Sequence, residues 1–179
     1  AFDEGGAIRV KNSGSQVKLA NVLFEANEAK DGGAISMDDL ASEVDIKSST
    51  FKNNRALQGN GGAIKSMARM KIQLSSFEAN EANAGEGGAI YTEKDVNMTG
   101  SSMKLNKANK GGAMKSKNNK ITMSNMVLEN NEAVQDGGAI DSFNAEVDVS
   151  TSTIKGNKAK NGGAVRAEQK HQCGFNCKR

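Results

Sequence analysis

Apolar and polar residues alternate along short stretches of this chain, and the alternation recurs at regular intervals. Each stretch has two apolar positions separated by one residue that is usually polar, as in Val44-Asp45-Ile46. The first apolar position is occupied by Val17, Val44, Met70, Val96, Ile121 and Val147, and the second by Leu19, Ile46, Ile72, Met98, Met123 and Val149. A period of two indicates a β-strand with one buried face, because successive side chains point to opposite sides.

Two motifs frame this alternation. A tetrad of Gly-Gly-Ala and an aliphatic residue occurs at Gly5–Ile8, Gly32–Ile35, Gly61–Ile64, Gly87–Ile90, Gly111–Met114, Gly137–Ile140 and Gly162–Val165. An apolar anchor is followed three positions later by Asn and five positions later by Ala. The anchors are Phe24, Phe51, Phe77, Met103, Leu128 and Ile154. Successive tetrads begin 24 to 29 residues apart, and a repeat of that length predicts a stacked array.

The repeat predicts an all-β fold, a single-stranded parallel β-helix with three short strands in each turn. One strand begins at the tetrad, one covers the alternating stretch and one leads through the anchor. Three strands of about five residues and their corners fill about 25 residues. We predict one domain over residues 1–179, as a segment of a longer or polymerising protein, with about seven turns. These turns begin near residues 5, 32, 61, 87, 111, 137 and 162.

The asparagines and glycines have structural explanations. Equivalent side chains of a parallel stack lie about 4.8 Å apart, so their amides can form a hydrogen-bonded ladder. The predicted ladder consists of Asn27, Asn54, Asn80, Asn106, Asn131 and Asn157. We also expect these asparagines to adopt left-handed backbone at a corner, and the glycines to allow close approach. Phosphate binding by the glycines is the alternative, but no Gly-Lys-Ser/Thr follows them.

Charges alternate in sign from turn to turn at three outward positions. The position after the anchor holds Glu25, Lys52, Glu78, Lys104, Glu129 and Lys155. Three positions further on stand Glu28, Arg55, Glu81, Lys107, Glu132 and Lys158. Eight positions before the anchor, the run is Glu43, Arg69, Asp95, Lys120 and Glu146. Opposite charges stacked in this way attract, and the alternation opposes a slip by one turn.

The ends of the coil are predicted binding surfaces. The last full repeat presents Lys155 and Lys158, whereas the first presents Glu25 and Glu28, so another copy stacked on the end would continue the alternation. Open strand edges also need a cap or a partner. We expect no N-terminal cap, because a tetrad begins at Gly5. The expected partners are therefore further copies or neighbouring β-helix segments.

The motif pair resembles the repeats of chlamydial polymorphic outer-membrane proteins. Phe24–Asn27, Phe51–Asn54 and Phe77–Asn80 match the Phe-x-x-Asn motif strictly, and later repeats replace Phe with another apolar residue. The likeness covers Gly5 to Val165. It implies a right-handed parallel β-helix of the pectin-lyase-like type, a hand that parallel crossovers also favour. It further implies an adhesive or structural role at the cell surface or outside the cell, with a host or matrix surface as a further partner.

Enzymatic activity is the less favoured interpretation. Polysaccharide lyases and hydrolases on this scaffold need clustered carboxylates, often with calcium. Here Arg69 and Lys71 separate Glu43 and Asp45 from Asp95, which indicates a paired surface, and Asp38-Asp39 is read as a turn. The remaining outward acids are Glu146 and Asp148. We predict no catalytic residue, metal ligand or cofactor; the alternative is a carbohydrate-binding or polysaccharide-degrading protein that uses a lateral face.

Composition and the remaining motifs add little. A net charge of +3 does not indicate nucleic-acid binding, and no apolar run approaches the length of a membrane span. Cys173 and Cys177 are predicted to form a disulfide; a free or intermolecular thiol, or zinc binding with His171, are alternatives. Asn97-Met98-Thr99 is a glycosylation sequon on an outward position. Ice binding is disfavoured, because we expect the hydroxyls before the anchors to face inward.

Overall fold

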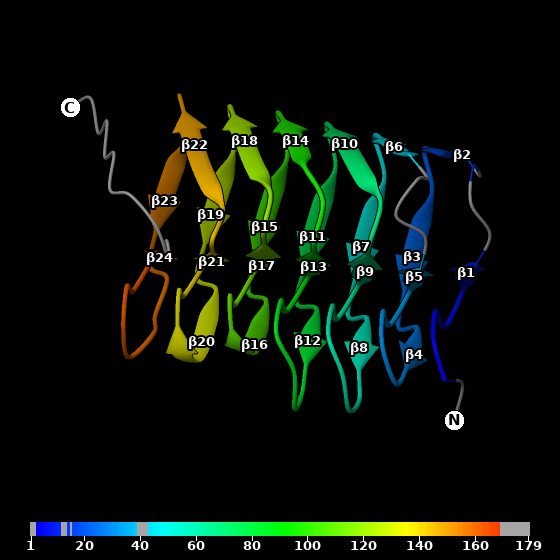
Figure 1. The fold of residues 1–179 in the computed structure, drawn as a ribbon, viewed down its shortest axis with the longest axis horizontal. Helices are drawn as coiled ribbons and strands as arrows, with labels where there is room; N and C mark the ends of the chain where they lie inside the picture. The colour runs from blue at the N-terminus through cyan, green and yellow to red at the C-terminus, as the bar shows by residue number, and fades with distance from the viewer. Residues whose placement is uncertain (1–2, 12–13, 15, 39–42, 169–179) are drawn as a thin grey trace.

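The chain winds as a parallel β-helix of about six turns (Figure 1). The structure is a computed structural model that describes residues 3–11, 14, 16–38 and 43–168. Within these ranges every regular element is a β-strand, and every strand pairing is parallel. The fold class predicted from the period-two pattern is therefore confirmed.

Four parallel sheets run along the coil. The first sheet, which begins at the tetrads, contains β1 Ile8–Val10, β5 Ile35–Met37, β9 Ile64–Ser66, β13 Ile90–Thr92, β17 Met114–Lys117, β21 Ile140–Phe143 and β24 Val165–Glu168. The second contains β2 Gln16–Ala20, β6 Glu43–Lys47, β10 Arg69–Gln73, β14 Val96–Thr99, β18 Lys120–Ser124 and β22 Glu146–Ser150. The third contains β3 Leu23–Glu25, β7 Thr50–Lys52, β11 Ser76–Glu78, β15 Ser102–Lys104, β19 Val127–Glu129 and β23 Thr153–Lys155. The fourth contains β4 Glu28–Ala29, β8 Arg55–Ala56, β12 Glu81–Ala82, β16 Lys107–Lys110 and β20 Glu132–Asp136.

Equivalent positions of successive repeats lie directly beside one another. Val44 pairs with Val17 on one side and Met70 on the other. The rings of Phe24, Phe51 and Phe77 stack with centroids 4.8 and 4.7 Å apart. The apolar columns thus form one continuous core along the inside of the coil.

The fourth sheet was not predicted, and its cause is a left-handed corner. The residue before each ladder asparagine has positive φ, for example 55° at Ala26 and 58° at Leu105. This conformation ends the anchor strand and turns the chain, so a separate short strand follows the asparagine. We expected the ladder asparagines themselves to have left-handed backbone. That expectation was wrong, because the residue before each asparagine has the positive φ instead.

A second left-handed corner separates the second and third sheets. It falls three positions before the anchor, at residues such as Ser48 and Leu74, with φ of 48° and 50°. The corner interrupts the alternation of side chains between the two strands. The residue before the anchor therefore faces outward, and Leu23 is 60% exposed. The expectation that the hydroxyls of Thr50 and Ser76 face inward was wrong, because both side chains are partly exposed.

Candidate functional site: stacked polar columns and a lateral groove

The six motif asparagines form one column inside the corner of the coil. In the step from Asn54 to Asn80, the main-chain N–H and the Nδ2 of Asn54 both donate to Oδ1 of Asn80, each at 3.0 Å. The same two donors act in every step of the column. Nδ2 of Asn54 also donates to the carbonyl of Phe24 at 2.9 Å. Because every bond between two ladder asparagines is donated by the earlier one to Oδ1 of the later one, the column has a direction.

A serine column runs parallel to it and was missed from the sequence. Ser49, Ser75, Ser101 and Ser152 lie two positions before their anchors. Each Oγ accepts the main-chain N–H of the preceding turn, as in the 3.1 Å bond from Ser49 to Ser75. The hydroxyl donates in turn to the carbonyl two residues earlier. The signal was available, because serine occupies this position in four of the six repeats.

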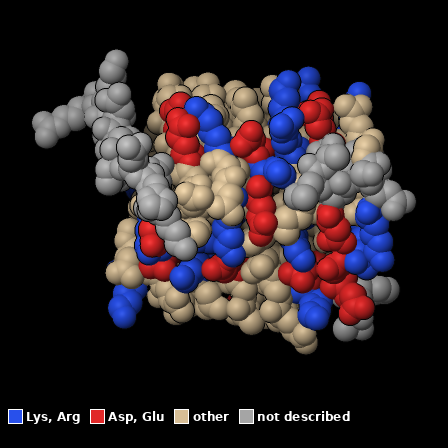
Figure 2. Space-filling view, in the orientation of Figure 1, with Lys and Arg blue, Asp and Glu red and all other residues tan. Residues whose placement is uncertain are grey.

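The outward charges of the third and fourth sheets lie in register, with opposite signs adjacent. Lys104 pairs with Glu129 at 3.0 Å, and Arg55 lies between Glu28 and Glu81 at 3.1 and 3.7 Å. Acidic and basic side chains are also intermixed on the face of the molecule that Figure 2 shows. The paired side chains of the third and fourth sheets are partly exposed, so each pair contributes about 0–1 kcal/mol. Their alternation therefore fixes register more than it adds stability.

A denser set of ion pairs lies along the tetrads, and we call it the tetrad seam. It consists of the residues directly before the tetrads, Glu4, Asp31, Asn60, Glu86, Lys110, Asp136 and Asn161, and those directly after, Arg9, Ser36, Lys65, Tyr91, Lys115, Asp141 and Arg166. Lys115 and Asp141 form an ion pair with side chains 4% and 0% exposed. Arg166 contacts Asp141 at 3.3 Å and Asp136 at 3.4 Å. The seam is therefore buried at Lys115 and Asp141, whereas Arg9 and Asn161 near its two ends are exposed.

Two groups in the seam have shifted pKa values. The hydrogen bond from Asn161, at 2.9 Å, lowers the pKa of Asp136, and the cations Lys110 and Arg166 add to the effect. Burial raises the pKa of Tyr91 to about 12, helped by the hydrogen bond between its hydroxyl and Glu93. Both shifts favour the protonation state that holds the seam together near neutral pH.

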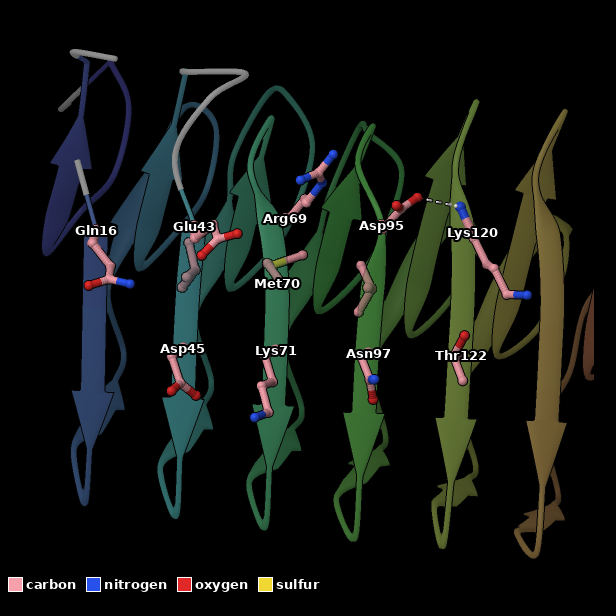
Figure 3. A pocket seen from close by; sticks show the side chains of 12 residues that line it. Gln16, Glu43, Asp45, Arg69, Met70, Lys71, Asp95, Asn97, Lys120 and Thr122 are labelled. Atoms are coloured by element: carbon pink, nitrogen blue, oxygen red, sulfur yellow. Dashed lines mark hydrogen bonds between the residues drawn. The ribbon is translucent and has the colours of Figure 1, made fainter. Parts of the chain in front are cut away.

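The outer face of the second sheet contains a shallow groove of about 420 Å³. Figure 3 shows the side chains that line it. These include Glu43, Asp45, Arg69, Lys71, Asp95, Asn97, Lys120 and Thr122. The strands β6, β10, β14 and β18 place most of them, because every second residue of each strand points outward, and Asp95 directly precedes β14. The polar side chains along the groove are therefore mixed in charge.

Charge pairing in the groove is less complete than the sequence indicated. Lys120 contacts Glu146 at 3.0 Å, and its main-chain N–H donates to Asp95 at 2.9 Å. That contact with Glu146 raises the pKa of Lys120 above its usual value. Among the described residues, however, Arg69 and Lys71 have no ion-pair partner. Oδ1 of Asp45 is buried and accepts no hydrogen bond from the described part of the chain.

The structure describes only some of the remaining candidate residues. Asn97 is exposed on β14, within the groove, so its sequon stays a prediction. Asp39, His171, Cys173 and Cys177 lie outside the described residues. Where the structure describes the chain, no three potential metal ligands gather into one site. None of those residues forms a helix with the length and apolarity of a membrane span.

Comparison with known proteins agrees with the motifs. Residues 48–66 and 75–93 match the model of the Chlamydia polymorphic membrane protein repeat. Each matched segment runs from an anchor strand through a ladder asparagine and into the next tetrad strand. No curated protein and no solved structure matches the chain. The resemblance predicted from the motif pair is therefore confirmed: two segments of this β-helix are similar to the Chlamydia polymorphic membrane protein repeat.

Proposed function

We propose that this chain is a non-enzymatic structural or adhesive module, located at the cell surface or outside the cell, and one length of a longer β-helical rod. The observation that carries the proposal is the asparagine column, which links every turn from Asn27 to Asn157 by hydrogen bonds. About six turns, with seven stacked strands in the first sheet, span about 30 Å, which suits a spacer whose role lies in assembly. The matched repeat supports the surface location, since it takes its name from membrane proteins.

The distribution of charge supports a structural role. The most buried ionic groups, Lys115 and Asp141, neutralise each other and are shielded from solvent. The exposed charges of the third and fourth sheets alternate in sign across adjacent turns. A catalytic site instead needs groups whose charge or hydrogen-bonding capacity is directed at a ligand.

The non-enzymatic proposal is tested with a panel of polysaccharides, including polyuronides, with and without added calcium. We expect no release of reducing ends or unsaturated products above a heat-denatured control. Turnover of any substrate in the panel would overthrow the proposal. Antibody labelling of intact, unpermeabilised source cells checks the surface location, and labelling only after permeabilisation would contradict it.

A second candidate function is carbohydrate binding in the lateral groove. The observation in its favour is the pair of cations there, Arg69 and Lys71, which have no ion-pair partner among the described residues. Such cations would suit an acidic saccharide, whose carboxylates accept hydrogen bonds from them.

A glycan array tests this second candidate. The double variant Arg69→Gln/Lys71→Gln should lose binding to acidic glycans. The matched control Lys47→Gln/Lys52→Gln removes the same charge outside the groove lining and should retain it. Equal binding by both variants would place recognition elsewhere, and no binding by the unmodified chain would remove the candidate.

A further inference from the structure

The second glycine of each tetrad is required only where another turn follows. A Cβ added at Gly6, Gly33, Gly62, Gly88, Gly112 or Gly138 would lie 2.0–2.3 Å from a carbonyl oxygen of the next turn. At Gly163, in the last tetrad, the nearest atom would be the carbonyl oxygen of Asn157 at 3.6 Å, an ordinary contact. Gly163 also lacks the positive φ that favours glycine. The last tetrad therefore has a glycine that becomes necessary once a further turn stacks on β24.

The first and last tetrad strands are alike in sequence. Gly5-Gly-Ala-Ile8 is followed by Arg9, and Gly162-Gly-Ala-Val165 is followed by Arg166. The five internal tetrads are followed instead by Ser36, Lys65, Tyr91, Lys115 and Asp141. Arg9 contacts Asp38 of the second turn at 3.2 Å. An arginine at the position of Arg166 can make the same contact if β24 stands where β1 stands.

The ends are complementary in hydrogen bonding. At the first turn, Oδ1 of Asn27, the first asparagine of the described column, accepts no hydrogen bond from the described residues. At the last turn, the main-chain N–H of Asn157 has no acceptor among the described residues. The N–H and Nδ2 of each earlier asparagine donate to the next Oδ1. One end thus offers donors and the other an acceptor, which match only in a head-to-tail arrangement.

The charged residues at the two ends of the coil independently favour the same head-to-tail arrangement. If the last turn contacts the first turn of another copy, Lys155 faces Glu25 and Lys158 faces Glu28, as each cation of these columns faces an acid within the chain. In the second sheet Asp148 would face Lys18, continuing the column in which Lys18 pairs with Asp45. Contact between two identical ends would instead bring like charges together, which is repulsive.

We propose that a second copy of this chain docks head to tail on the β24 end, and that β24 replaces the β1 strand of the incoming copy. The inference rests on the proposed function, in which the rod continues beyond the coil. Replacement is needed because the described chain has seven strands in the first sheet but six in the second and third. The incoming β2 and β3 can reach β22 and β23 only if one of the two tetrad strands leaves. β1 is the strand that leaves, because it pairs with β5 through three residues, whereas β24 pairs with β21 through four.

The first test uses sedimentation velocity over a range of concentrations. We expect the unmodified chain to form elongated oligomers. Gly163→Val should leave the melting temperature unchanged and remove the oligomers, because its side chain occupies the place of the next turn. The matched variant Gly138→Val should unfold, since its Cβ would lie 2.0 Å from the carbonyl oxygen of Gly163. An unmodified chain that stays monomeric at every concentration would overturn the inference. Oligomers that persist in the Gly163→Val variant would also overturn it.

The second test exchanges the charges of the ends. Neither Lys155→Glu/Lys158→Glu nor Glu25→Lys/Glu28→Lys should associate alone, but an equimolar mixture should, because each then offers the opposite charge to the other. The control Lys104→Glu/Lys107→Glu makes the same change in the middle of the coil and should leave association intact. Circular dichroism verifies that each variant is folded. If both charge variants are folded and their equimolar mixture still remains monomeric, the proposed head-to-tail contact is wrong.

A third variant tests strand replacement itself. A Cβ at Gly6 would lie 2.3 Å from the carbonyl oxygen of Gly33, so Gly6→Val weakens the pairing of β1 with β5. We expect association at equal or lower concentration, because β1 must leave in any case. Weaker association would show that β1 stays in place, and would overturn replacement. These outcomes are separate from polysaccharide turnover, which would instead overturn the proposed non-enzymatic function.

Discussion

Asn80 shows how one residue type holds successive turns together. It is fully buried, and its Oδ1 receives two hydrogen bonds from Asn54 while its Nδ2 donates to Asn106 and to the carbonyl of Phe51. The column could be predicted from the sequence, because the asparagines recur at one position of a period-two repeat. The left-handed residue beside it could not, because Ala26, Ala79 and Leu105 have no side-chain chemistry that favours positive φ.

Replacing Asn80 with alanine should strongly destabilise the coil. The change leaves the buried N–H groups of Asn54 without an acceptor, and each unsatisfied buried group costs about 1–3 kcal/mol. Urea denaturation measures the difference in the free energy of unfolding. Asn83→Ala is the control, because Asn83 is exposed, and its effect should stay within about 0.5 kcal/mol. Equal effects of the two changes would show that the column contributes no stability.

Tyr91 reports directly on the tetrad seam. It is the single tyrosine of the chain, so its ultraviolet absorbance titrates without interference. We expect a midpoint near pH 12 in the folded protein, against 10.0 for an ordinary tyrosine, because burial and Glu93 disfavour the phenolate. Its contribution to stability is full below pH 10, and it is lost as the pH rises through about 12. An ordinary midpoint with the fold intact would show that the side chain is accessible to water.

Strands in this molecule are short because left-handed corners end them. The apolar columns predicted the strands of the first three sheets, since their side chains face one core. The fourth sheet escaped prediction, because its strands β4, β8 and β12 have only two residues, too few to display a period. For the groove, the sequence predicted only that charged side chains point outward. It did not predict the ion pairs, because these depend on side-chain conformations that a periodic pattern does not specify.

The corner at Leu105 can be improved. Leu105 has a φ of 58° and is 48% exposed, whereas the equivalent residues Asn53 and Asn130 are of a type that tolerates this conformation. Leu105→Asn should therefore raise the free energy of unfolding by about 0.5–1 kcal/mol. Leu23→Asn, at an exposed site without positive φ, should give no such gain. A lower melting temperature for Leu105→Asn would contradict the interpretation.

At the scale of the whole molecule, interior and surface interactions have separate roles. The asparagine and serine columns are shielded from solvent over most of their length, whereas the alternating charges of the third and fourth sheets are partly exposed. Salt screens exposed charges more than buried hydrogen bonds. The turns are therefore held mainly by their interior, and the charges chiefly select the register.

Between about 0.01 and 1 M salt, the Debye length falls from about 30 to 3 Å. We expect this change to alter the melting temperature of the isolated coil by only a few degrees. Differential scanning calorimetry on the Gly163→Val variant measures this without the influence of association. A large fall in melting temperature would mean that the charge columns, rather than the asparagine and serine columns, hold the turns together.

The nearest-neighbour stacking has a mechanical consequence. Each strand pairs only with the equivalent strands of the turns before and after it, so tension applied between the two ends loads the terminal turn first. A detached turn releases 24 to 29 residues, or about 80–100 Å of extended chain. The rod would lengthen in uniform steps while the remaining turns keep their shape, and so would absorb work without failing as a unit.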